Sequence, residues 1–165
     1  MEVGVLAALV AALSVTVAGS VQGDQFLVDL GHATIGAVGP KDSVRQLRAK
    51  FGAGNVIRTV GRLEGSPNVT FVVSIAGHKV VQHWNYVSTS DSAFKTKEGV
   101  GVGSTMADFA RYYGEALRGE GEGASFLNFR PSGGTQFQVR VSDQCFAHVA
   151  HLKADKVCTV REILL

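Results

Sequence analysis

The sequence has little charge and few cysteines. Only 18% of its 165 residues are charged and 45% are hydrophobic, a composition typical of a chain that folds and not of a disordered one. The formal net charge is +2 and the basic residues are scattered, so neither nucleic acid nor an anionic membrane surface is indicated as a partner. The length suits one domain, or two small repeats that share a core.

Lysine and arginine are absent from residues 1–23. The apolar run from Val3 to Ala18 is short for a membrane span and suits the core of a signal peptide. Small residues then permit cleavage after Ser20 or after Gly23. We therefore predict a signal peptide over 1–23 and a periplasmic or secreted mature chain over 24–165, with no stable membrane insertion of that chain. An uncleaved N-terminal anchor is the alternative.

The chain has only two cysteines, Cys145 and Cys158. An even number of cysteines in an oxidising compartment predicts one disulfide. Together with His148 and His151 the same cysteines form a set of soft ligands that zinc accepts, but their spacing matches no standard structural zinc site. Because export favours oxidation of the thiols, we predict a disulfide and no metal or other cofactor, with the four-ligand zinc site as the alternative.

Two short segments share one pattern, "SVRQLRAKFG" over 43–52 and "TMADFARYYG" over 105–114. Each begins with a hydroxyl residue that can cap a helix, and a possible capping-box partner follows three residues later. Apolar residues recur at positions i, i+4 and i+8, and a glycine stands where a helix would end. We therefore predict two helices and an internal duplication, with repeats over about 36–90 and 99–165.

Stretches rich in β-branched and aromatic residues follow each predicted helix. Phe71, Val73 and Ile75 alternate with more polar neighbours, which predicts strands with one buried face. The prediction is an α+β fold of two repeats, each laying one helix on three strands of an antiparallel sheet. The charged, glycine-rich segment 118–124 is predicted to be a loop. The expected strands cover 56–64, 68–77, 78–88, 124–131, 135–143 and 156–165, after an initial strand over 25–30.

The glycine-rich stretch "GVGVGST" over 99–105 raises the question of phosphate binding. No lysine follows the glycines, so the stretch is not a Walker A loop. The first copy of the pattern keeps the helix and its cap without this run of glycines. We therefore predict that the glycines turn the chain into the helix.

Candidate catalytic groups are few. His32, His78 and His83 are isolated along the chain, and no serine lies in a nucleophile elbow. No catalytic residue is predicted. The candidate binding residues are four aromatic side chains: Trp84, Tyr86, Tyr112 and Tyr113.

The layout Ile-Gly-x-Val-Gly-Pro over 35–40, followed by a helix ending in Phe-Gly and then by "TKEGVGVGST" over 96–105, resembles the RpoE-regulated lipoprotein family of the bacterial envelope. The resemblance covers about 26–165. It implies an exported protein and no assigned reaction. The chain departs from that family because it has no cysteine for lipidation, so the resemblance does not imply a membrane tether.

These observations predict an exported, non-catalytic protein that binds another protein or an envelope component. The alternative is a small periplasmic hydrolase or metal-dependent enzyme that uses His148 and His151 with nearby carboxylates.

Overall fold

The structure is a computed structural model that describes residues 24–63, 65–121, 124–132, 134–148 and 158–165. The predicted signal peptide lies outside these residues. Within them, no helix is long and apolar enough to cross a membrane. The strands of the main sheet are β3 (Val56–Leu63), β4 (Ser66–Ile75), β5 (His78–Gln82), β6 (Val87–Thr89), β7 (Leu117–Gly121), β8 (Ala124–Phe129), β9 (Phe137–Arg140) and β10 (Glu162–Leu164).

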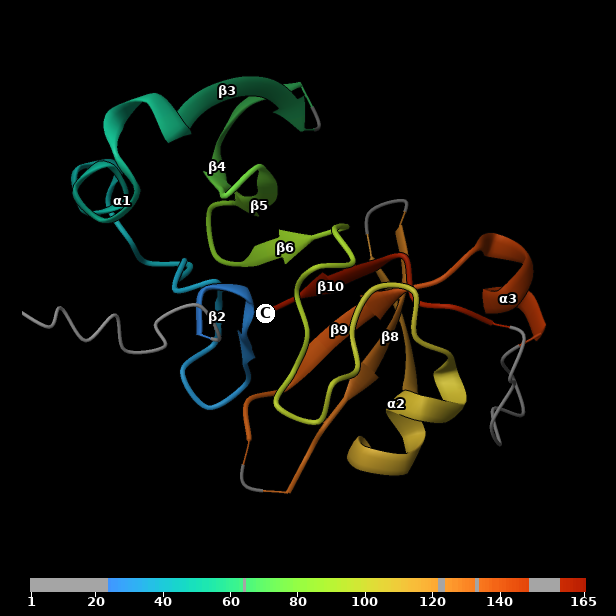
Figure 1. Cartoon of the computed structure of the whole chain (residues 1–165). Coiled ribbons are helices and arrows are strands. Elements are labelled where there is room, and N and C mark those ends of the chain that lie inside the picture. The colour runs from blue at the N-terminus through green and yellow to red at the C-terminus, as the bar shows by residue number, and fades with distance from the viewer. Residues whose placement is uncertain (1–23, 64, 122–123, 133, 149–157) are drawn as a thin grey trace, which may run out of the picture.

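These strands form one antiparallel sheet in the order β3-β4-β5-β6-β10-β9-β8-β7 (Figure 1). The predicted α+β class is confirmed. A two-stranded hairpin and short helices accompany the sheet. They are η1 (Asp24–Phe26), β1 (Val28–Asp29), β2 (Thr34–Ile35), α1 (Val44–Phe51), η2 (Ala53–Asn55), α2 (Met106–Tyr113) and α3 (Asp143–His148).

The two predicted helices begin and end as their sequences indicate. At the start of α1 the Ser43 hydroxyl accepts the backbone N–H of Gln46, and the Gln46 side chain accepts the N–H of Ser43, which completes a capping box. Thr105 forms the same motif at the start of α2, with an aspartate three residues later. Both helices end at a glycine with positive φ, 87° at Gly52 and 80° at Gly114.

One face of the sheet is buried beneath the helices. Its centre pairs Ile163 with Val139 and Val139 with Leu127, and all three side chains are fully buried. Phe109 of α2 packs on this face, with its ring 5.7 Å from that of Phe129 and 6.2 Å from that of Phe137. Apolar burial on this face is the main favourable contribution to the fold.

Three details of the strand prediction are wrong. The strand expected over 25–30 is instead η1 followed by the two-residue β1, which pairs with β2 and not with the main sheet. Segment 118–124 is not a loop, because residues up to Gly121 form β7 and pair with β8. The glycines mislead here: a Cβ on Gly119 would collide with the ring of Phe126 and the amide of Asn128, so glycine permits close packing within the sheet. Each helix is also followed by four strands of the sheet and not by three: after α1 because segment 78–88 divides into β5 and β6, and after α2 because β7 is added.

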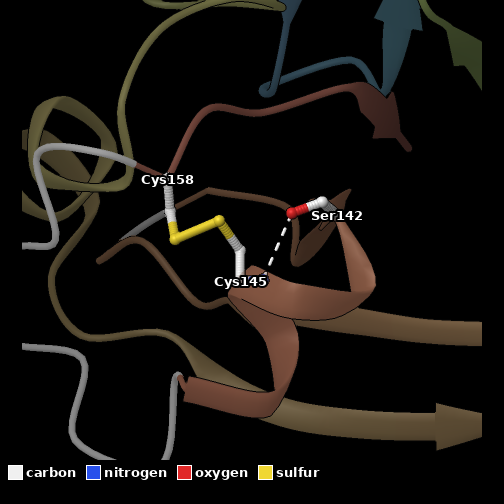
Figure 2. The surroundings of a disulfide bond; sticks show 3 residues. All are labelled: Ser142, Cys145 and Cys158. Atoms are coloured by element: carbon white, nitrogen blue, oxygen red, sulfur yellow. Dashed lines mark hydrogen bonds between the residues drawn. A yellow bond between two sulfur atoms is a disulfide. The ribbon is translucent and has the colours of Figure 1, made fainter.

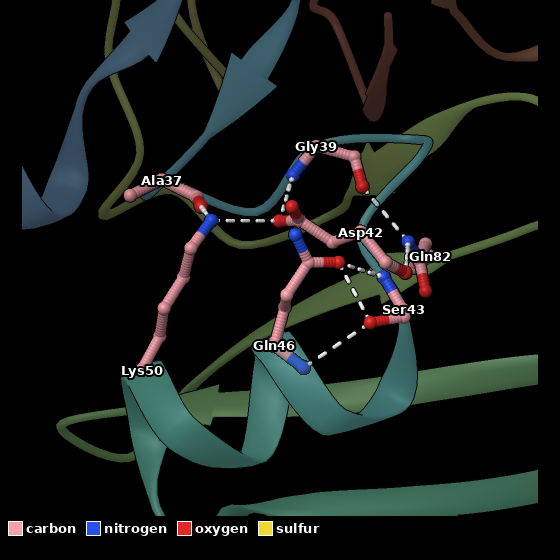
Figure 3. A network of polar contacts seen from close by, with 7 residues as sticks. All are labelled: Ala37, Gly39, Asp42, Ser43, Gln46, Lys50 and Gln82. Carbon is pink, nitrogen blue, oxygen red and sulfur yellow. Dashed lines mark hydrogen bonds and ion pairs between the residues drawn. The ribbon is translucent and has the colours of Figure 1, made fainter.

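A polar network fastens the segment before α1 to the sheet (Figure 3). The buried Gln82 at the end of β5 donates from Nε2 to the carbonyl oxygens of Gly39 and Asp42, at 2.8 and 2.7 Å. Lys50 donates to Asp42 Oδ2 at 2.9 Å and to the Ala37 carbonyl at 3.2 Å. The start of the first helix is therefore held to the covered side of the sheet.

Candidate binding surface

The second face of the sheet lies opposite the buried Val139 and Ile163, and its outer strands carry exposed side chains, whereas Ser88 and Leu164 at its centre are buried. We call it the open face. Strand pairing places one row of residues across all eight strands of this face. The row runs Ile57, Val72, Val81, Ser88, Leu164, Gln138, Asn128 and Leu117.

The row begins with three apolar side chains at its β3 end, turns polar at Gln138 and Asn128, and ends at the exposed Leu117 of β7. Ile57 is 61% exposed, and Val72 and Val81 beside it are half-buried. Across the sheet, the Gln138 amide donates to Asn128 Oδ1 at 3.1 Å. A sheet face that meets water is ordinarily polar, so the apolar end is the unusual part of this surface.

An aromatic and charged cluster lies near the centre of the open face. His83 stacks on Tyr86 with ring centroids 4.1 Å apart, and His83 Nε2 lies 3.3 Å from Ser88 Oγ. Arg140 on β9 forms an ion pair with Glu162 on β10 at 3.2 Å. The Arg140 Nε is buried and has no hydrogen-bond partner among the described residues.

Burial sets the protonation of this cluster. It lowers the pKa of His83; Glu162 partly opposes that shift, and Arg140 adds to it. Burial likewise raises the pKa of the Tyr86 hydroxyl. At neutral pH the stacked pair is therefore uncharged, and the charge of the cluster belongs to the Arg140–Glu162 ion pair.

The four predicted binding aromatics lie in two places. Trp84 and Tyr86 are in the connection between β5 and β6, where Trp84 is 88% exposed. Tyr112 and Tyr113 are at the end of α2, where they line a separate cavity. Tyr113 also belongs to the core, with its ring 5.1 Å from that of Phe137. The four do not form a single site.

The predicted disulfide joins Cys145 of α3 to Cys158, with the Cα atoms 5.6 Å apart (Figure 2). The Cys145 N–H donates to Ser142 Oγ at 3.2 Å, and the Cys158 carbonyl accepts the N–H of Met106 at 2.8 Å. The disulfide therefore connects α3, the segment before β10 and the first turn of α2.

The alternative zinc site is not assembled, because the two sulfur atoms are bonded to each other. His148 is the last residue of α3, and His151 lies outside the described residues. In the part of the chain that the structure describes, no three His, Cys, Asp or Glu side chains are grouped to hold a metal ion.

The glycine-rich stretch before α2 turns the chain and uses its own N–H groups. Gly103 has φ 85° and donates to the Val160 carbonyl at 2.8 Å, and Met106 donates to the Cys158 carbonyl at the same distance. The Thr105 N–H donates to the aspartate of the capping box. With these donors engaged inside the protein, the stretch is a turn and a cap, as predicted.

Sequence reasoning missed the partners of the histidines. His78 lies 2.9 Å from an Asp91 carboxylate oxygen, and His32 lies 2.7 Å from one of Asp29. It also missed Arg140, whose only sequence signal is its polar place in the alternation of β9. That alternation could not show which strand would lie beside it.

No protein-family model, curated protein or solved structure matches the chain.

Proposed function

We propose that the chain is an exported, non-catalytic protein that binds another protein through the open face. The observation that carries the proposal is the exposed apolar end of this face, formed by Ile57, Val72 and Val81, and the exposed Trp84 lies in the connection that follows β5. Contiguous exposed apolar surface marks interaction sites, and tryptophan is enriched among the residues that dominate binding energy.

The chemistry of the surface indicates what kind of partner it would bind. The apolar end fits an apolar patch, and the Arg140–Glu162 ion pair on the same face fits polar groups at the rim of an interface. A folded protein supplies both at once, and it can cover the roughly 800 Å² per partner that specific interfaces bury.

The disulfide supports the exported part of the proposal, since such bonds form and persist in oxidising compartments. A resemblance to envelope lipoproteins, stated above, agrees with it. We further propose that the two halves are repeats over about 36–90 and 99–165. In support, each predicted helix precedes four strands, and the sheet order of the second half mirrors that of the first about the β6–β10 pair.

Site-specific photo-crosslinking in the source cells tests the proposal. A benzophenone amino acid replaces Trp84 in the connection after β5, and in a matched control it replaces the exposed Arg45 of α1. We expect a protein adduct from position 84 and none from position 45. The captured protein is then purified, and its dissociation constant is measured by calorimetry. We expect Ile57→Lys and Trp84→Ala each to weaken binding at least tenfold and Arg45→Ala to leave it unchanged.

Three results would contradict the proposal. They are adducts from position 45 alone, an adduct at position 84 with lipid or glycan only, and a purified partner whose affinity is indifferent to both Ile57→Lys and Trp84→Ala. A circular dichroism spectrum matching that of the parent protein shows that each variant is folded.

A further inference from the structure

A second surface feature lies at the end of α2 and shares Leu117 with the row of the open face. It is a cavity of about 810 Å³. The β1–β2 hairpin, residues 96–98, the end of α2 and the turn after β8 line it. This volume lies within the range of pockets that hold small ligands.

The carboxylate of Glu98, held in place by a hydrogen bond, lines the cavity. Glu98 has only 21% of its side chain exposed, and its Oε2 accepts a hydrogen bond from the Tyr113 hydroxyl at 2.5 Å. Burial raises the pKa of Glu98, but hydrogen bonds, that of Tyr113 first, outweigh burial and lower its pKa overall. Burial and the same hydrogen bond raise the pKa of Tyr113. The proton therefore stays on Tyr113 and the negative charge on Glu98.

This charge has only a weak counter-ion within the protein. Lys97 lies 3.7 Å from Glu98 Oε1 but is 85% exposed, and an exposed pair of this kind contributes little. Asp29 and Glu115 add two further carboxylates to the lining, and Arg130 is its second cation. With three carboxylates and two cations, the lining has a net charge of −1.

Two further residues line the cavity. Tyr112 is 48% exposed, and an aromatic ring beside a carboxylate can contact a cation through its face. Thr96 is buried, and its hydroxyl lies against both Glu98 and Tyr113 and lowers the pKa of each. Thr96 therefore helps to hold the Glu98 carboxylate in place.

We propose that this cavity binds an organic cation carrying a primary ammonium group, with Glu98 as its counter-ion and Tyr112 as its aromatic wall. The proposal does not rest on the protein-binding role of the open face. A free diamine and a lysine side chain of a peptide present the same chemistry.

Titration followed by amide NMR tests the proposal with three probes. They are 1,5-diaminopentane, a blocked lysine tripeptide and glutarate, an anion of similar length. We expect saturable shifts at the cavity residues Gly114 and Leu117 with either amine and none with glutarate. The tighter-binding amine identifies the source.

Matched variants show which group is responsible. Glu98→Gln keeps an acceptor for Tyr113 but removes the charge, and we expect it to weaken amine binding at least tenfold. Tyr112→Leu removes the aromatic wall and is expected to weaken binding about threefold. Asp143→Asn removes an exposed carboxylate outside the cavity, so the dissociation constant should not change.

The proposal is overturned if glutarate shifts the cavity amides and the amines do not, which would assign the site to Arg130 and Lys97. It is also overturned if Glu98→Gln and Asp143→Asn weaken binding equally, or if no amine shifts these amides. Melting temperatures of the variants show whether a loss of binding reflects unfolding.

Discussion

At the scale of single residues, Gln82 is the polar side chain on which the fold depends most clearly. It is 3% exposed and donates both amide hydrogens to backbone carbonyls of the segment before α1. Gln82→Leu leaves one buried and one part-buried carbonyl without these donors, so we expect a loss of about 2–4 kcal/mol in the free energy of unfolding. Urea denaturation measures it.

Lys50→Met is the matched control for this network. Lys50 is 45% exposed where it meets Asp42, so its ion pair is screened by solvent and its loss should cost less than about 1 kcal/mol. Equal costs for the two variants would contradict the assignment of the main role to Gln82.

His83 makes stability depend on pH. Burial lowers its pKa in the folded state below the usual 6.5, so between these two values the unfolded chain binds more protons than the folded one. The stability associated with the neutral His83 side chain is fully present above pH 6.5. As the pH falls toward the folded-state pKa, the free energy of unfolding declines with a slope of at most about 1.4 kcal/mol per pH unit. We expect His83→Gln to lose less stability than the parent protein between pH 7.5 and pH 5, as measured by urea denaturation. Identical profiles would mean that His83 does not titrate in this window.

At the scale of elements, the two capping boxes are equivalent in geometry but differ in surroundings. The Thr105 box is part-buried and the Ser43 box is exposed. We expect Thr105→Ala and Ser43→Ala each to cost about 1 kcal/mol, with the larger loss at Thr105. Gly114→Val should cost more than either, because φ is 80° there. Chemical denaturation gives all three values, and a Thr105→Ala protein of unchanged stability would contradict the capping role.

Helix ends were predictable from the sequence because their determinants are local. The hydroxyl, its partner three residues later and the final glycine of α1 and α2 all lie within one short segment. Strand β7 was not predictable, because its glycine is explained by Phe126 on the neighbouring strand. Gln82 and its partners Gly39 and Asp42 are separated by about forty residues, and no local pattern connects them.

At the scale of the whole molecule, strand order decides which surfaces exist. The pairing of β6 with β10 joins Ser88 to Leu164, far apart in the chain, and brings Arg140 and Glu162 near His83. Alternation in each strand predicts one buried face but does not say what lies on the other. The class of fold could therefore be predicted from the sequence, whereas the open face and the cavity could be found only from the order of the strands in the sheet.

Export is, after strand order, a second property of the whole molecule. We predict that mature protein recovered from the source begins near Val21 or Asp24, because a short apolar run followed by small residues is typical of a cleaved signal peptide. Intact mass spectrometry of the exported protein measures the new N-terminus. A mass that includes Met1 would instead favour the uncleaved anchor.

The disulfide links three parts of the molecule, so its loss should lower the stability of the whole fold. Replacing both Cys145 and Cys158 by serine frees a segment closed across 13 positions, and we expect a loss of about 2–4 kcal/mol in stability with the fold retained. His148→Ala and His151→Ala should leave stability almost unchanged, because the two cysteines are bonded to each other and do not join these histidines as metal ligands. Thermal melts with reductant and with chelator, run side by side, distinguish a disulfide from a zinc site. We expect reductant to lower the melting temperature and chelator to leave it unchanged. A melting temperature that falls with chelator alone would instead support the zinc site and with it the enzyme alternative.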